Sequence, residues 1–351
     1  MRSARRAGPR VAPGTTPPEG GWIMRNGNQQ GRGPCGWARP WAGFAILVLL
    51  GVLAAGRALA QGDPAGDVRL TGAPDPAPSY YRMTTEFVRI EPDGRRMAPD
   101  VHDVWIESAP APGGDLDVTC RRYTFREGDS AAVAIPALGG WSYRFRRTAT
   151  GLDERGWIFG IDQAKFAQLT DERGAVLPQA LAYCMFNAFV DFHSFCQVFA
   201  ERTSGGGGIQ DLRRIGQKVV HAASRVEAPI SLAGFAEPGS VFRLGEVTLE
   251  LKGLSLVDGR RCALVGYDSG DASLRMTVRP APQVSLEVRG SSHFFGDLYV
   301  DLESQTVRKA ALAEFVVQET SGAVLPQKIH TVVERKILLR ALGKGEFERG
   351  L

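Results

Sequence analysis

The chain has 351 residues, of which 44% are hydrophobic and 23% are charged, and its formal net charge is +4. The basic excess lies in residues 1–60, which contain eight arginines and one acidic residue, so residues 61–351 carry 34 basic and 37 acidic side chains. This remainder has no basic stripe or basic arm, which argues against nucleic-acid binding.

Residues 1–60 have the pattern of a secretory signal peptide. An arginine-rich start leads to the apolar run WAGFAILVLLGVLAA, and ALA precedes Gln61. Residues 42–55 would span only about 21 Å as a helix, which is shorter than the roughly 30 Å hydrocarbon core. We therefore predict cleavage near Ala60, a periplasmic or extracellular location and no transmembrane span in the mature chain. Met24 precedes a more ordinary signal sequence, which leaves open whether it is the true start.

Two regions show the two-residue period of half-buried β-strands. WSYRF, residues 141–145, alternates aromatic with polar side chains, and VTLELKGLSLV alternates apolar with polar ones before the turn pair Asp258 and Gly259. Further short strands separated by turn residues follow to the end of the chain. We predict an α+β fold dominated by β-structure, with an antiparallel meander or half-barrel and a central apolar helical segment.

Composition divides the chain into six segments. A stretch rich in Pro, Gly and Asp follows the signal peptide and is typical of a flexible linker. The predicted segments are a signal peptide (1–60), a flexible linker (61–78), an N-terminal antiparallel β region (79–175), a helical segment with a glycine-rich connector (176–223), a C-terminal antiparallel β meander (224–342) and a disordered tail (343–351).

A phenylalanine-rich segment, residues 176–200, is almost free of charge. Eighteen of its 25 residues are apolar, Asp191 is its only carboxylate, and it has no Lys or Arg. Its length favours a helix, and five polar residues in its second half argue against a membrane span. Two alternatives remain, a core helix packed across a sheet and a lid over a sheet's hollow. The predicted apolar face consists of Leu181, Met185, Phe192, Phe195 and Phe199.

Asp191 and His193 raise the question of an acid and histidine pair. On a helix their side chains point about 200° apart and cannot cooperate, whereas on a strand they would share a face. A hydrolase would rest only on these two residues and His102. The histidines show no metal-ligand spacing, and no nucleophile motif is present, so we predict no catalytic residue, metal or cofactor and leave enzymatic activity uncertain, leaning against it.

Four cysteines follow the signal peptide, and their pairing is open. If residues 176–200 form a helix, Cys184 and Cys196 lie about 18 Å apart and cannot be bridged to each other. Either each pairs with a distant cysteine, Cys120 or Cys262, or all four are buried small hydrophobic residues.

The segment GDLYVDLESQTVRKAAL, residues 296–312, resembles the strand-turn-strand units of the half-barrel superfamily of exported lipoprotein carriers, the LolA- and LppX-like proteins. The resemblance covers about the last 115 residues. It implies a curved sheet whose concave face, closed by helices, shelters acyl chains or other apolar ligands. The matching residues are Leu298, Tyr299, Val300, Asp301, Val307 and Arg308.

Our functional hypothesis is noncatalytic binding of an apolar, lipid-like ligand between a curved sheet and the apolar helix of an exported envelope protein. The alternative is a structural or protein-interaction role in the cell envelope, with a protein partner. Empty volume distinguishes a ligand site from ordinary core, because a binding pocket encloses about 300 Å³ or more. The predicted ligand-binding residues are Tyr183, Phe189, Phe192, Phe195 and Phe199.

Overall fold

The structure is a computed structural model, and all that follows concerns the compact unit Asp63–Leu351. The predicted signal peptide lies outside the described residues, so the structure does not bear on it. The described residues are 67–70, 75–148, 151–152, 159–230, 236–281 and 283–351.

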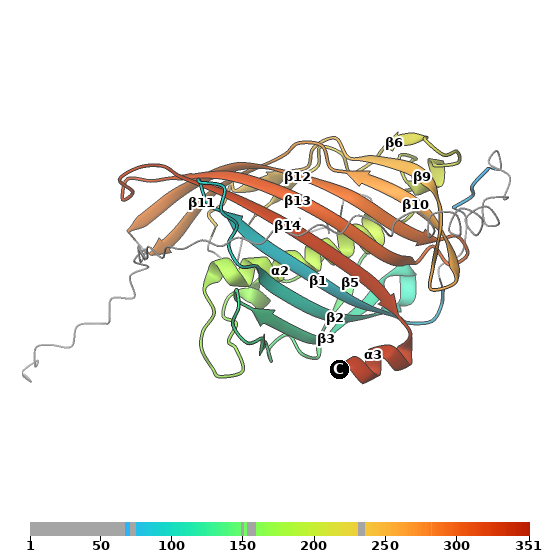
Figure 1. Cartoon of the computed structure of the whole chain (residues 1–351), viewed down its shortest axis with the longest axis horizontal. Helices are drawn as coiled ribbons and strands as arrows, with labels where there is room; N and C mark the ends of the chain where they lie inside the picture. Colours follow the sequence, from blue (N-terminus) through green and yellow to red (C-terminus); the bar gives the residue numbers. More distant parts are fainter. Residues whose placement is uncertain (1–66, 71–74, 149–150, 153–158, 231–235, 282) are drawn as a thin grey trace, which may run out of the picture. The chain divides into compact units, whose positions relative to one another are not determined.

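A single antiparallel sheet of 14 strands dominates the described residues (Figure 1). Its main path runs β4-β3-β2-β1-β14-β13-β12-β10-β9-β6, and the remaining strands branch from it. The strands are β1 (Ser79–Ile90), β2 (Asp100–Pro110), β3 (Leu116–Arg126), β4 (Val133–Ala134), β5 (Trp141–Phe145), β6 (Lys218–Val220), β7 (Glu227–Pro229), β8 (Val241–Arg243), β9 (Thr248–Val257), β10 (Arg260–Asp268), β11 (Ala272–Ala281), β12 (Val284–Asp301), β13 (Val307–Ser321) and β14 (Ile329–Leu342).

The first and last long strands of the chain are neighbours. β1 pairs with β14 in one unbroken register, from Tyr80 opposite Leu342 to Ile90 opposite Val332. The N-terminal and C-terminal β regions are therefore parts of one sheet. This confirms the predicted β-dominated fold, a large open antiparallel sheet with one central helix.

The tight turn predicted at Asp258 and Gly259 joins β9 to β10. Both residues have positive φ, +50° and +76°. Two consecutive residues with positive φ are typical of a two-residue hairpin turn. The backbone twist of such a turn matches the right-handed twist of the two strands that it joins.

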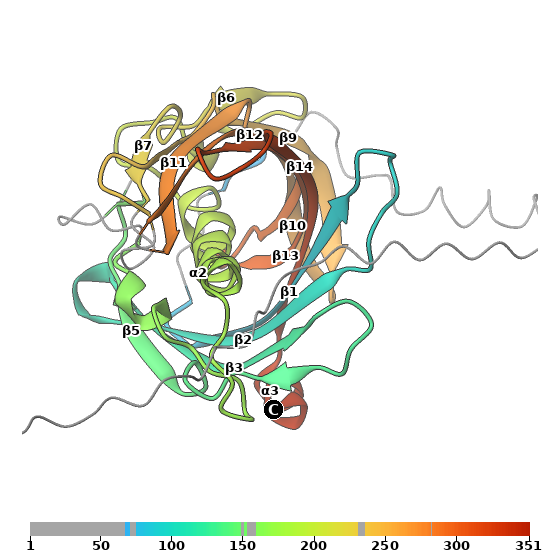
Figure 2. The same cartoon turned by 90° about the vertical axis from the view of Figure 1, so that its left-hand side faces the viewer.

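The central rod of the fold comprises the helix α2 (Gln179–His193) and the π-helical turn η3 (Ser194–Val198) that continues it. Pro178 precedes α2, where the amide hydrogen that proline lacks is not needed. The sheet curves around this rod, as Figure 2 shows most directly. The shorter helices are η1 (Pro112–Gly114), η2 (Gln163–Phe166), η4 (Ile209–Asp211) and α3 (Lys344–Gly350).

Two segments predicted to lack structure are partly packed. In the predicted linker, Leu70 is only 1% exposed, and the amide of Val68 donates to the Arg213 carbonyl at 2.8 Å. The predicted disordered tail forms α3, in which Phe347 is 1% exposed and packs on Trp105. In both cases one large apolar side chain in a polar stretch packs against the folded protein. Its burial stabilises the folded state by about 1.5–3 kcal/mol.

Within the described part of the chain, no helix has both the length and the apolar character needed to cross a membrane.

Candidate functional site

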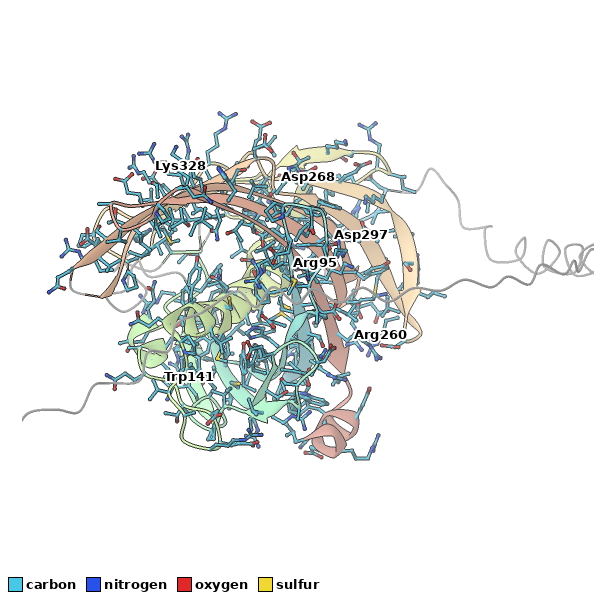
Figure 3. All side chains as sticks on the ribbon, turned by 60° about the vertical axis from the view of Figure 1, so that its left-hand side comes forward. Arg95, Trp141, Arg260, Asp268, Asp297 and Lys328 are labelled. Atoms are coloured by element: carbon cyan, nitrogen blue, oxygen red, sulfur yellow. The ribbon has the colours of Figure 1, made fainter. Side chains whose placement is uncertain are left out.

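The phenylalanines of the rod fill the concave side of the sheet. Phe189 and Phe192 have no exposed surface, and Phe195 and Phe199 are 2% and 3% exposed. The ring of Phe189 meets that of Trp141, which is labelled in Figure 3, edge to face at 5.2 Å. Such close aromatic packing is that of a protein core.

These residues therefore do not line a roomy cavity. Tyr183 borders a cavity that holds about 10 Å³, room for about one water molecule. The four phenylalanines are not in the lining of that cavity. Phe192 packs on Tyr81, and Phe195 and Phe199 pack on Tyr267. The structure brings the five residues together along one rod, where the four phenylalanines are packed core and Tyr183 is half-buried.

Asp191 and His193 do not meet, as their helical spacing predicts. The His193 ring stacks on Phe145 at 4.3 Å, and its two nitrogens lie 2.6 Å from the Tyr143 hydroxyl and 3.0 Å from the Gln197 amide oxygen. A neutral imidazole that donates to Gln197 and accepts from Tyr143 satisfies both contacts. Burial lowers the pKa of His193 to about 3, so the ring is held neutral.

Asp191 instead belongs to a buried ion cluster with Arg335 of β14 and Glu314 of β13. Arg335 donates to Glu314 at 2.6 Å and also donates to Asp191. The three side chains are at most 8% exposed. The guanidinium also lies between the rings of Phe87 and Phe294, 5.0 and 5.1 Å from their centroids. The cluster fixes the middle of the rod to the sheet.

The burial of the polar side chains on the rod differs from what the sequence predicts. Sequence periodicity places Asp191 and Gln197 on a polar face, yet both are only 5% exposed. The sheet encloses the rod on more than one side and supplies the polar partners itself. Burial raises the pKa of Asp191 to about 7, although the Arg335 guanidinium opposes that rise.

A larger pocket of about 250 Å³ opens at the C-terminal end of the rod. It lies between the sheet and η3, and it is somewhat smaller than the roughly 300–1,000 Å³ of typical sites for drug-sized ligands. We call it the end pocket. Its lining comprises Asp75, Pro76, Ala77, Ser79, Tyr81, Ser108, Pro110, Ala111, Gly114, Asp115, Leu116, Arg147, Cys196, Gln197, Glu201, Ser304, Gln305 and Thr306.

The change from α-helix to π-turn supplies two residues of the pocket wall. The Phe199 amide donates to the Ser194 carbonyl at 2.9 Å, which is the wider i to i+5 spacing. Cys196 and Gln197 lie in this turn and line the end pocket. Single π-turns inside helices are rare and often occur at functional sites.

The opposite wall is the turn between β12 and β13. Asp301 accepts hydrogen bonds from the amides of Glu303 and Ser304, at 2.8 and 3.2 Å. Gln305 has a φ of +56°, and its side-chain amide donates to the Leu70 carbonyl at 2.6 Å. A non-glycine residue in the left-handed region is held there by its surroundings, which places the Gln305 side chain against the pocket.

The remaining wall carries an ion pair. Arg147 Nε lies 3.3 Å from Glu201 Oε2, and the two side chains are 33% and 27% exposed. Burial raises the pKa of Glu201 to about 7, and the Arg147 guanidinium partly offsets the rise. The end pocket thus combines apolar, neutral polar and charged surface.

The four cysteines are free thiols, and three of them, Cys120, Cys196 and Cys262, are buried. This agrees with the alternative of small buried side chains. In the part of the chain that the structure describes, no three His, Cys, Asp or Glu residues are arranged to hold a metal ion.

Sequence reasoning missed the end pocket and the ion cluster. Arg335 and Glu314 could have been found, because each is a charge in the apolar phase of an alternating strand, Val333-Arg335-Ile337 and Leu312-Glu314-Val316. The pocket joins residues more than 200 positions apart through a π-turn, and no local pattern signals that.

No family model and no curated protein match the chain. Nineteen chains of solved structures match. One is a structure titled "Lipid-protein interactions in lipovitellin", with a TM-score of 0.36 and 8% identity, in a match that covers 77% of this chain and 25% of that one. This chain thus spans about a quarter of the length of that neighbour. The comparisons do not confirm the resemblance to the lipoprotein-carrier half-barrels, and the chain is described by its fold, an open antiparallel sheet with one central helix.

Proposed function

We propose that the protein binds a small lipid-like ligand, without chemical turnover, in the end pocket between the curved sheet and the helical rod. The observation that carries this proposal is the 250 Å³ pocket itself, which lies where the rod changes to a π-turn. The cavity beside the N-terminal turns of α2 holds only about 10 Å³ and has no room for such a ligand.

The pocket wall suits a molecule with an apolar part and a polar end. Tyr81, Leu116 and Cys196 are buried and offer apolar surface, while Ser108 and Gln197 offer hydrogen-bonding groups. A few precisely placed polar groups in an otherwise apolar wall are typical of ligand sites, where they fix the ligand's orientation.

The first test is a binding measurement with N-phenyl-1-naphthylamine, an uncharged apolar dye that fluoresces when shielded from water. We expect saturable binding to the wild-type protein. Ala111 lines the end pocket, so Ala111→Trp should fill the space and weaken binding by roughly tenfold or more. The matched control is Ala131→Trp, at an exposed loop position outside the pocket, which should bind as the wild type does.

Native mass spectrometry of the protein purified from its own host complements the dye. We expect a bound mass in the wild type and none in Ala111→Trp. The proposal is wrong if the dye shows no saturable binding, or if the dye binds Ala111→Trp as tightly as the wild type.

We also propose that the mature protein acts outside the cytoplasm. The support is the signal-peptide pattern of residues 1–60, with its basic start, short apolar run and small residues before Gln61. N-terminal sequencing of the protein from the envelope or medium should begin at or near Gln61. A chain that keeps Met1 or Met24 would contradict export by cleavage.

A second candidate function, interaction with a protein partner, is favoured by apolar side chains on the outer face of the sheet. The rings of Phe295 and Phe315 stack there at 6.4 Å, and each is at least 40% exposed, near Val317 at 50%. Charged side chains such as Asp268 project nearby from the same face (Figure 3). Chemical crosslinking in cells should capture a partner that Phe315→Ser loses, and an unchanged crosslinking pattern would remove this candidate.

A further inference from the structure

The end pocket contains hydrogen-bonding groups that the protein leaves open. The Ser108 side chain is on β2, Gln197 is in η3, and Gln305 is in the β12–β13 turn, and these residues are 5%, 5% and 9% exposed. They come from three separate elements and converge on one cavity. Because these side chains border the end pocket, their open positions can be satisfied there by water or by the polar group of a ligand that replaces it.

In the side chains of Gln197 and Gln305, one polar atom of the amide group forms a hydrogen bond within the protein and the other does not. The Gln197 oxygen accepts from His193 at 3.0 Å, which leaves its NH₂ group, and the Gln305 NH₂ group donates to the Leu70 carbonyl, which leaves its oxygen. Among the described residues, no hydrogen bond of the protein engages either remaining atom or the Ser108 hydroxyl, and all three side chains border the end pocket. The open set is therefore a donor, an acceptor and a hydroxyl that can act as either.

The charges around the pocket disfavour an anion. Its lining carries the carboxylates of Asp75, Asp115 and Glu201 and one cation, Arg147, which already pairs with Glu201 at 3.3 Å. Within the described part of the chain, Asp75 and Asp115 have no ion-pair partner. An incoming carboxylate or phosphate would meet two like charges and a guanidinium that is already engaged.

A cation does not fit the buried wall either. The three open side chains are neutral, and the carboxylates of Asp75 and Asp115 are exposed and half-buried, respectively. A charge held among neutral groups of low exposure loses hydration that these groups do not fully replace. A neutral group that both donates and accepts hydrogen bonds matches the wall best.

We propose that the end pocket recognises an uncharged polar head group, a hydroxyl or an amide, and rejects anionic lipids such as fatty acids and phospholipids. This inference rests on the proposed function and names the class of ligand. The head group accepts from the Gln197 NH₂ group, donates to the Gln305 oxygen and contacts the Ser108 hydroxyl. The apolar part lies against Tyr81 and Leu116.

A series of ligands with the same short chain and different head groups tests the inference. Displacement of N-phenyl-1-naphthylamine is measured with monooctanoylglycerol, octanamide, octanoate and octyltrimethylammonium. We expect the two uncharged ligands to displace the dye at concentrations roughly tenfold or more below those of octanoate, with the ammonium compound also weaker than the uncharged pair. Equal or stronger displacement by octanoate or by the ammonium compound would overturn the inference.

Variants of the open groups sharpen the test. Ser108→Ala and Gln197→Leu should each weaken monooctanoylglycerol roughly tenfold, and weaken it by a larger factor than the dye, because a wall without those groups no longer satisfies the head group. Ser130→Ala, in an exposed loop, is the matched control. Asp115→Lys should improve octanoate binding. If both Ser108→Ala and Gln197→Leu leave monooctanoylglycerol binding at the wild-type level, the head-group assignment is wrong.

Different results would contradict the proposed function and the head-group inference. If the dye itself does not bind, the proposed function fails. If the dye binds and Ala111→Trp abolishes that binding, while octanoate competes as well as monooctanoylglycerol, only the head-group inference fails.

Discussion

The middle and the C-terminal end of the helical rod differ in how the sheet encloses them. Around Phe189 the sheet supplies an aromatic ring, Trp141, and around Asp191 it supplies the Arg335 guanidinium. The side chains of Phe189 and Asp191 are both buried. Around Gln197 the helix widens to a π-turn and a pocket of about 250 Å³ remains. One apolar segment thus serves as core along most of its length and as a pocket wall at its end.

The largest expected effect comes from removing the cation that fixes the middle of the rod. Arg335→Met leaves Asp191 and Glu314 buried without their partner. We expect the free energy of unfolding to fall by about 3–5 kcal/mol, measured by urea denaturation. Arg340→Met, at an exposed position of the same strand, is the control. A loss no greater than that of the control would show that the cluster does not hold the rod.

A smaller effect is expected from loosening the aromatic packing. Phe189→Leu should lower the free energy of unfolding by about 1–3 kcal/mol, because it leaves unfilled space among packed rings. Phe295→Leu, at a position 42% exposed, should change it by less than about 0.5 kcal/mol. Equal effects of the two substitutions would mean that the middle of the rod is not tightly packed.

The pH dependence of stability tests whether the rod buries a neutral histidine. The pKa of His193 is lowered from 6.5 to about 3 in the folded protein, so below about pH 6.5 the unfolded chain binds a proton that the folded chain does not. Its contribution to stability is complete above about pH 6.5 and is lost as the pH falls towards 3.

Substitution isolates this contribution. Between about pH 4 and 6, the slope of the unfolding free energy against pH should be shallower in His193→Gln than in the wild type, by up to about 1.4 kcal/mol per pH unit. His330→Gln, at an exposed position of β14, is measured in parallel as the control. Parallel curves for His193→Gln and the wild type would contradict a buried neutral ring.

The sequence predicts the parts of this fold that local patterns control. The lack of charge over residues 176–200 identifies the rod, and Asp258 and Gly259 identify a hairpin turn, because helix period and turn chemistry are read within a few residues. The packed tail was missed because the burial of Phe347 depends on Trp105, which lies far away in the sequence.

The sequence predicts a site among the phenylalanines of the rod, whereas we propose the site at the end of the same segment. Phenylalanine density identifies apolar burial, and it does not distinguish a packed core from a cavity wall, because both bury the same surface. Whether a residue of the rod lies in packed core or in a cavity wall depends on which residues of the sheet lie opposite it. For Phe189 that partner is Trp141, and for Gln197 it includes the turn at Gln305, 108 residues further along the chain.

The most direct test of the central claim compares dye binding to two variants in parallel, one at each region of the rod. N-phenyl-1-naphthylamine is titrated into Ala111→Trp and Phe189→Leu, with folding checked by circular dichroism. The account predicts that Ala111→Trp loses binding while its unfolding free energy stays within about 0.5 kcal/mol of the wild type, and that Phe189→Leu is less stable but binds normally. Loss of binding in Phe189→Leu together with normal binding in Ala111→Trp would contradict it.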